Sequence, residues 1–209
     1  MRDAAEASIR EAPQEAPGDR AVERFLLVTA GVVSFALLTW AGARSSVPLP
    51  STPVPGSLQT LAVLLSGAIL GARRGAASQS LYLAMGLAGL PVFAHPGAGP
   101  AYFLGPTGGY LLGFVAGSYV TGASLPRLRG FGVAGSLLSF SLGTAAVYAS
   151  GIAWLIVLLG GDALQALRLG LAPFALFDLA KIVIASGLLT GWARVSGMVK
   201  GAWRTGTER

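Results

Sequence analysis

Two residues of opposite charge, Asp178 and Lys181, lie three positions apart in the otherwise apolar segment 173–193. If this segment is helical, a spacing of three places both side chains on one face. A charge at the centre of a bilayer costs at least about 2.5–3.5 kcal/mol on insertion scales, so the pair indicates a shared interior site. Two interpretations stay open. The pair is an internal ion pair without a ligand, or Lys181 meets a substrate carboxylate while Asp178 accepts hydrogen bonds from substrate N–H groups.

Four further side chains are candidates for the same site. Gln59 is the only amide of its predicted helix, and a buried amide needs a partner, either nearby backbone or a ligand. Tyr82 and Phe93 can supply the apolar, aromatic wall that a ring-shaped ligand needs, although plain packing is the simpler interpretation of each residue alone. Thr107 offers a hydroxyl to a ligand or caps the helix that follows it.

The sequence argues against bond chemistry. The chain has no Cys and a single His, His95, so a Ser-His-Asp arrangement is not credible and no cluster of metal-ligating residues exists. The phosphate-binding pattern G-x-x-x-x-G-K-[ST] does not occur, which excludes ATP binding through a P-loop. We therefore expect a binding protein that is not an enzyme and that needs neither a cofactor nor a metal.

The composition is typical of an integral membrane protein. Of the 209 residues, 53% are hydrophobic and only 11% are charged, whereas soluble domains carry about 25% charged residues. The net charge of +6 is concentrated at the ends of apolar segments, as membrane topology requires. We therefore expect the lipid bilayer, and no nucleic acid, as a partner.

The predicted fold is an all-α integral membrane protein with six transmembrane helices. A bilayer core of roughly 30 Å needs about 20 helical residues, and some of the apolar segments are shorter than that. The six segments are residues 22–41, 57–70, 76–90, 110–122, 133–159 and 173–193. We assign 22–193 to a membrane substrate-binding domain, 1–21 to a disordered cytoplasmic tail and 194–209 to a basic cytoplasmic tail. Residues 160–170 are expected to form a loop.

Six spans place both termini on one side of the membrane, and the basic residues indicate which side. Twelve of the fifteen basic residues fall on one predicted side and two on the other, and the remaining one is Lys181. Cytoplasmic loops carry an excess of Lys and Arg, so we expect both termini in the cytoplasm.

The chain is organised around residues 82–113, and within this segment residues 86–113 hold eight glycines and four prolines. Proline lacks the N–H that a helix needs, and glycine loses the most backbone entropy when it is held helical, so one long helix is excluded. An apolar, irregular segment between membrane helices is expected where backbone folds over a cavity. The alternative is an ordinary connector. In the six-helix topology this Gly/Pro-rich loop joins the third and fourth helices on the outer face.

Glycines recur at four-residue spacing in two of the predicted helices. Gly109, Gly113 and Gly117 form one row, and Gly187 and Gly191 form another. Small residues at this spacing let helices approach closely in lipid. Packing within the bundle is the simpler interpretation, and docking of a partner membrane protein is the alternative.

Several motifs resemble those of the BioY family. GLAGLPVFA and LGPTGGYLLGF flank the centre of the Gly/Pro-rich loop and are similar to the family's signature. PVPGSLQTLAVLLSG, which contains Gln59, resembles its Pro-Val-Pro-x-x-x-Gln-Thr-Leu segment. PFALFDLAK matches its Pro-Phe-x-x-x-Asp-x-x-Lys motif at Pro173, Phe174, Asp178 and Lys181. The resemblance extends over nearly the whole membrane portion, from about residue 47 to residue 185.

The resemblance implies a function in biotin uptake. Members of this family are S-components, which capture the vitamin for an energy-coupling-factor (ECF) transporter in the bacterial inner membrane. Two ABC-type ATPase subunits and a transmembrane coupling protein are then the implied partners. Lys181 would meet the valerate carboxylate of biotin, and Asp178 would meet the N–H groups of its ureido ring. Two alternatives remain: an S-component for another carboxylated vitamin, and a membrane scaffold in which the pair is purely structural.

Overall fold

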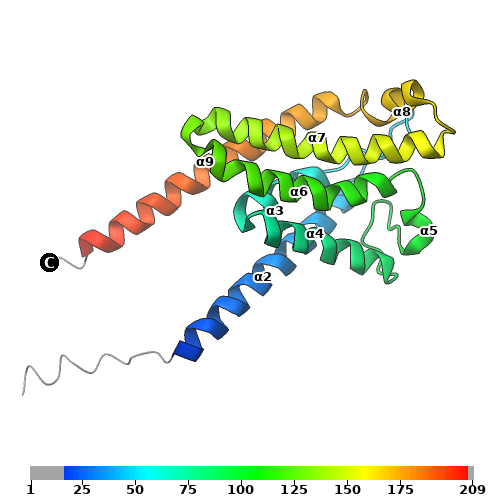
Figure 1. Cartoon of the computed structure of the whole chain (residues 1–209). Helices are drawn as coiled ribbons and strands as arrows, with labels where there is room; N and C mark the ends of the chain where they lie inside the picture. Colours follow the sequence, from blue (N-terminus) through cyan, green and yellow to red (C-terminus); the bar gives the residue numbers. More distant parts are fainter. Residues whose placement is uncertain (1–16, 207–209) are drawn as a thin grey trace, which may run out of the picture. The chain divides into compact units, whose positions relative to one another are not determined.

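The structure, a computed structural model, describes the backbone of residues 17–206 and the side chains of residues 21–191. The chain divides into two compact units, Met1–Gly31 and Val32–Arg209. Apart from one isolated antiparallel bridge between Val47 and Gly56, the described residues form helices and loops. The helices (Figure 1) are α2 Pro17–Arg44, α3 Gln59–Leu70, α4 Ala72–Leu87, α5 Gly99–Phe103, α6 Gly108–Leu128, the 3₁₀ turn η1 Arg129–Phe131, α7 Gly132–Leu158, α8 Ala163–Gly170 and α9 Ala175–Gly206.

Each of the six predicted segments coincides with a helix, and the differences lie at the ends. Helix α2 begins at Pro17, so the last residues of the predicted disordered tail are helical, while residues 1–16 lie outside the described part of the chain. Helix α9 continues to Gly206, well past the predicted end at residue 193. Helix α6 runs through Pro126 to Leu128. Pro126 has no N–H to donate to the backbone oxygen four residues back, and the helix ends two residues later.

Helices α3 and α4 form a short antiparallel hairpin. Gly71 lies between them with φ of +82°, a backbone conformation that glycine adopts without strain. The arms have 12 and 16 residues, about 18 and 24 Å at 1.5 Å per residue, and a single arm is therefore shorter than a bilayer core of roughly 30 Å.

Helices α6 and α7 form a second, longer hairpin, and they lie side by side in Figure 1. The glycine row of α6 makes the contact. A Cβ atom on Gly109 would lie 2.2 Å from Cβ of Trp154, and one on Gly117 would lie 2.8 Å from the backbone oxygen of Gly143. The two backbones therefore touch along their length, as the four-residue spacing predicted.

Two helical stretches of the described chain are long and apolar enough to cross a membrane, Ala21–Arg44 and Gly108–Leu158. A third is added if α8 and the first part of α9, which are bent by 52°, form one span. The second stretch folds back at η1 and so contains both arms of the α6–α7 hairpin. These arms have 21 and 27 residues, about 31 and 40 Å at 1.5 Å per residue.

The prediction of a loop at residues 160–170, between the last two long helices, was wrong in one respect. Residues 163–170 form helix α8. Asp162 caps it, because its carboxylate accepts a hydrogen bond from the backbone N–H of Gln165 at 2.8 Å. The two glycines at 160 and 161 end α7 with positive φ and made the whole segment look irregular.

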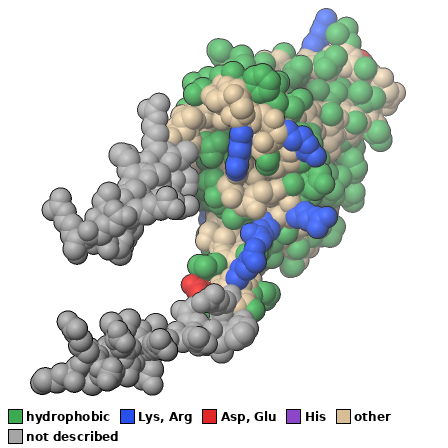
Figure 2. All heavy atoms as spheres, turned by 60° about the vertical axis from the view of Figure 1, so that its left-hand side comes forward, with side chains coloured by type: hydrophobic (Ala, Val, Ile, Leu, Met, Phe, Trp, Pro, Cys, Tyr) green, Lys and Arg blue, Asp and Glu red, His purple; other side chains and the backbone are tan. Residues whose placement is uncertain are grey.

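Much of the surface is apolar, as a lipid-facing surface is. Figure 2 shows hydrophobic side chains over much of the described part of the molecule, with several Lys and Arg side chains on the face that is turned forward. Leu176 is 77% exposed and Val157 is 76% exposed. Such large exposed side chains along helices match the surface that a bilayer solvates.

Two glycine substitutions are expected to change stability in opposite directions. A Cβ on Gly67 would lie 2.1 Å from the backbone oxygen of Ser118, so Gly67→Ala should force α3 from α6 and lower the free energy of unfolding by about 1–3 kcal/mol. Gly187, on α9, has no described atom within 4 Å of such a Cβ. Gly187→Ala should therefore raise stability by up to about 1 kcal/mol through helix propensity.

The measurement is thermal unfolding of both variants in the same detergent. A Gly67→Ala protein that melts at or above the wild-type temperature would contradict the close contact between α3 and α6.

Candidate ligand-binding site

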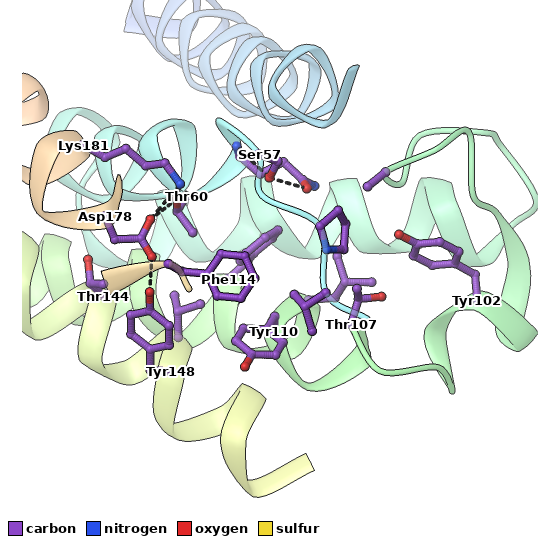
Figure 3. Close-up of a pocket in the computed structure, with 17 residues that line it drawn as sticks. Ser57, Thr60, Tyr102, Thr107, Tyr110, Phe114, Thr144, Tyr148, Asp178 and Lys181 are labelled. Carbon is purple, nitrogen blue, oxygen red and sulfur yellow. Dashed lines mark hydrogen bonds and ion pairs between the residues drawn. The ribbon is translucent and has the colours of Figure 1, made fainter. Parts of the chain in front are cut away.

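A pocket lies among α3, α6, α7, α9 and the segments 45–58 and 88–107, and its empty space, counted together with the solvent at its opening, is about 610 Å³. Figure 3 shows its lining side chains, with charged and hydroxyl groups at one end, Tyr110 and Phe114 in the middle, and Tyr102 and Thr107 at the other end. The lining residues are Val54, Pro55, Ser57, Gln59, Thr60, Ala94, Tyr102, Thr107, Tyr110, Leu111, Phe114, Thr144, Val147, Tyr148, Phe174, Asp178 and Lys181.

The predicted ion pair lies at the charged end of this pocket. Nζ of Lys181 donates to Oδ1 of Asp178 at 2.7 Å, and both side chains are largely buried. Nζ also donates to Oγ1 of Thr60 at 2.9 Å, and the Thr60 hydroxyl donates to Oδ1 of Asp178 at 3.3 Å. The hydroxyl of Tyr148 donates to Oδ2 of Asp178. Helices α3, α7 and α9 thus meet around one carboxylate.

The sequence did not single out Thr60 or Tyr148. Thr60 follows Gln59 directly in the segment PVPGSLQTLAVLLSG, which resembles a BioY motif, so its position in the sequence could have identified it as a site residue. Tyr148 is one of several aromatic residues in the apolar run of α7, and only the packing of α7 against α9 brings it to the carboxylate.

Gln59 lies at the pocket wall, and protein groups satisfy much of its amide. Its Nε2 donates to the hydroxyl of Tyr82 at 2.6 Å, and its Oε1 accepts from Ser57 at 2.9 Å. The Tyr82 hydroxyl in turn donates to the backbone oxygen of Val92 at 3.0 Å. The chain of bonds connects α3 and α4 with the start of the Gly/Pro-rich loop.

Tyr82 and Phe93 stand behind the pocket wall. Both side chains are fully buried, with ring centroids 5.7 Å apart in an edge-on arrangement. Phe93 stacks on Tyr102 at 5.1 Å, and Tyr102 is the ring that lines the pocket. The two residues therefore support the lining aromatic ring.

Thr107 and Tyr102 bring the Gly/Pro-rich loop to the far end of the pocket. Thr107 precedes α6 at its N-cap position, but its side chain makes no capping hydrogen bond. Burial raises the pKa of the Tyr102 phenol above its ordinary value, so this hydroxyl stays protonated at neutral pH and remains a donor.

A second pocket, with about 650 Å³ of empty space, adjoins the first and shares Ser57, Phe174 and Lys181 with it. Its other lining residues are Ser45, Val47, Leu49, Gly56, Leu58 and Phe177. Lys181 therefore faces both spaces, and the loop between α2 and α3, residues 45–58, forms a wall of the second.

Fold and site together define a small membrane protein, helical throughout its described part, with a mostly apolar pocket that has a charged end. A solved S-component for biotin from an ECF-type ABC transporter has the same fold, with a TM-score of 0.73 and 23% identity, over 82% of this chain and 93% of that chain.

A sequence model of the BioY family matches residues 19–197. The biotin transporter BioY of Thermotoga maritima is 38% identical over 77% of this chain and 90% of its own length. The probable biotin transporter BioY of Pyrococcus horikoshii is 35% identical over 74% and 88%. The chain belongs to the BioY family, which confirms the resemblance found in its motifs.

Proposed function

We propose that this protein captures biotin as the S-component of an ECF-type ABC transporter. The observation that carries the proposal is the buried Asp178–Lys181 pair in the wall of a pocket. Membership of the BioY family, whose relatives above are named as biotin transporters, supports the same function. The protein performs no bond chemistry and uses no cofactor, and biotin is its transported ligand.

The pocket offers complementary groups for the two polar parts of biotin. Asp178 is an acceptor for ureido N–H groups, and Lys181 is a cationic partner for the carboxylate. Tyr110 and Phe114, beside the charged end, supply apolar surface for the bicyclic ring. We assign Gln59 and Thr107 to the pocket wall, with Tyr82 and Phe93 holding the wall in place.

The ion pair restricts how biotin can lie. Asp178 and Lys181 are 2.7 Å apart, whereas the valerate chain of biotin separates its ring from its carboxylate. Biotin with its ring at Asp178 therefore reaches Lys181 from the side of the second pocket, which Lys181 also lines. In this arrangement the ring occupies the first pocket and the carboxylate lies toward the second.

We propose a multi-pass topology with six spans in the bacterial inner membrane, both termini in the cytoplasm and the Gly/Pro-rich loop outside. One structural contact supports the grouping of basic residues. A Cβ on Gly122 would lie 2.3 Å from the backbone nitrogen of Ala72, so the end of α6 meets the start of α4. Two exposed arginine pairs, Arg73–Arg74 and Arg127–Arg129, are therefore at the same end of the bundle, as the positive-inside rule requires.

The energy for uptake comes from partners in this proposal. The chain carries no P-loop, so two ABC-type ATPase subunits and a transmembrane coupling protein would supply ATP hydrolysis and the mechanical link. Copurification of the four-subunit assembly from cells that express all components tests this part. Recovery of this chain alone, while the two ATPase subunits and the coupling protein remain associated with one another, would contradict this part of the proposal.

Equilibrium binding of biotin by the purified wild-type chain in detergent tests the proposal as a whole. We expect saturable binding of biotin, and no competition from a large excess of lipoate or thiamin. Preference for one of those ligands would instead favour an S-component for another vitamin. A folded chain that binds none of them would support the scaffold alternative.

A further inference from the structure

The hydroxyl of Thr144 is buried in the pocket wall without a hydrogen-bond partner among the described residues. The side chain of Thr144 is 7% exposed and lines the first pocket. Its Oγ1 has no hydrogen bond. The hydroxyl of a threonine in a helix can donate to a backbone oxygen three or four residues back, as Thr39 does to Phe35 at 2.9 Å. Thr144 makes no such bond, and it lies in the wall of a pocket that can hold a ligand.

The neighbouring groups define which bonds remain open at this end of the pocket. An ionised carboxylate has about four acceptor sites. Asp178 uses two of them on Oδ1, for Lys181 and Thr60, and one on Oδ2, for Tyr148. One acceptor site on Oδ2 is therefore left for a ligand N–H. Thr144 lies one helical turn before Tyr148 on α7, and Figure 3 shows it at the Asp178 end.

We propose that the Thr144 hydroxyl donates a hydrogen bond to the ring carbonyl of biotin, beside an N–H that Asp178 accepts. A cyclic urea presents a carbonyl and an N–H on adjacent atoms, and the open donor of Thr144 and the open acceptor of Asp178 complement these two groups. This assignment rests on the proposed function, and it makes Thr144 a specificity-determining residue for the ring.

An unpaired buried hydroxyl is not by itself a sign of a ligand site, and Thr121 shows this. Its Oγ1 is also buried and lacks a partner in the described structure, but it lies outside the pocket. In both threonines a change to valine replaces the hydroxyl with a methyl group of similar shape, which removes an unpaired buried polar atom and should not lower stability. Thr121→Val is thus a matched control.

The test compares biotin affinity of the wild type, Thr144→Val, Thr144→Ser and Thr121→Val in detergent. We expect Thr144→Val to bind biotin about five- to tenfold more weakly, the value of a neutral hydrogen bond. Thr144→Ser keeps the hydroxyl and should stay within about twofold of the wild type, as should Thr121→Val. All four proteins should melt at similar temperatures without ligand.

A second measurement separates contact with the ring from a general change of pocket shape. Iminobiotin has an imine in place of the ring carbonyl, and this group is protonated at neutral pH, so it carries only N–H donors and cannot accept the proposed bond. The preference of the wild type for biotin over iminobiotin should shrink about five- to tenfold in Thr144→Val.

Wild-type affinity and an unchanged ligand preference in Thr144→Val would overturn the assignment of Thr144 while leaving the proposed function intact. Absence of biotin binding by the folded wild type would overturn both. If Thr144→Val fails to fold, Thr144→Ala against Thr144→Ser decides instead, because only the latter keeps the hydroxyl.

Discussion

Replacement of Asp178 by asparagine is expected to weaken biotin binding about 10- to 100-fold, since hydrogen bonds to charged groups are worth about 1.5–3 kcal/mol. The carboxylate has three protein donors and one remaining acceptor site that we assign to a ligand N–H. Asparagine has the same shape and keeps one acceptor oxygen. Its NH₂ group, however, is a donor, and it replaces a carboxylate oxygen that accepted hydrogen bonds. Isothermal titration or scintillation proximity with purified Asp178→Asn measures the loss.

The same substitution also leaves Lys181 without a counter-charge in a largely buried position. Removing one partner of a buried pair outright costs about 3–5 kcal/mol, and asparagine should cost less because its oxygen still accepts from Lys181. A double variant, Asp178→Asn with Lys181→Met, removes both charges and should regain thermal stability. We expect it to remain defective in binding. Recovery of biotin affinity together with stability would mean that the pair is structural, as in the scaffold alternative.

The charged end of the site was predictable because its key relationship is local. A spacing of three residues on a helix places Asp178 and Lys181 on one face whatever else the chain does. The cost of a charge inside an apolar segment then indicates that the two must pair, and the structure shows that they do.

The polar groups around that pair were not predictable in the same way. Tyr148 and Thr144 belong to α7, which shows no polar face in its sequence, and their proximity to Asp178 depends on how α7 packs on α9. Tyr82 and Phe93 show the converse. Their aromatic rings suit a ligand wall, but only the path of the loop shows that Tyr102, which stacks on Phe93, is the ring that lines the pocket.

The short helices were also beyond the reach of hydrophobic periodicity. Helix α5 has five residues, in a segment rich in glycine and proline, and α8 has eight, after two glycines with positive φ. Composition alone favours loops in both places. Asp162 is the residue that identifies the start of α8, because aspartate is favoured at the N-cap and its carboxylate accepts from the backbone N–H of Gln165.

Replacement of Lys181 by methionine is expected to abolish the preference for biotin over its methyl ester. The ester keeps the ring but lacks the negative charge, so the wild type should favour biotin by about tenfold or more through a charge-assisted bond. Methionine fills similar space without a charge. Affinity for the acid and the ester should therefore become equal, and both should bind more weakly because Asp178 loses the Lys181 hydrogen bond that holds its carboxylate in place.

Arg168→Met is the matched control, because Arg168 is an exposed cation on α8 that does not line either pocket. It removes the same charge from the predicted outer side and should leave the preference intact. If Lys181→Met still prefers the acid, the carboxylate binds elsewhere. The hydroxyl groups of Tyr102 and Thr107, at the opposite end of the first pocket, would then be the donors to test. The ring would still lie at Asp178, but the valerate chain would run along Tyr110 and Phe114 and away from the second pocket.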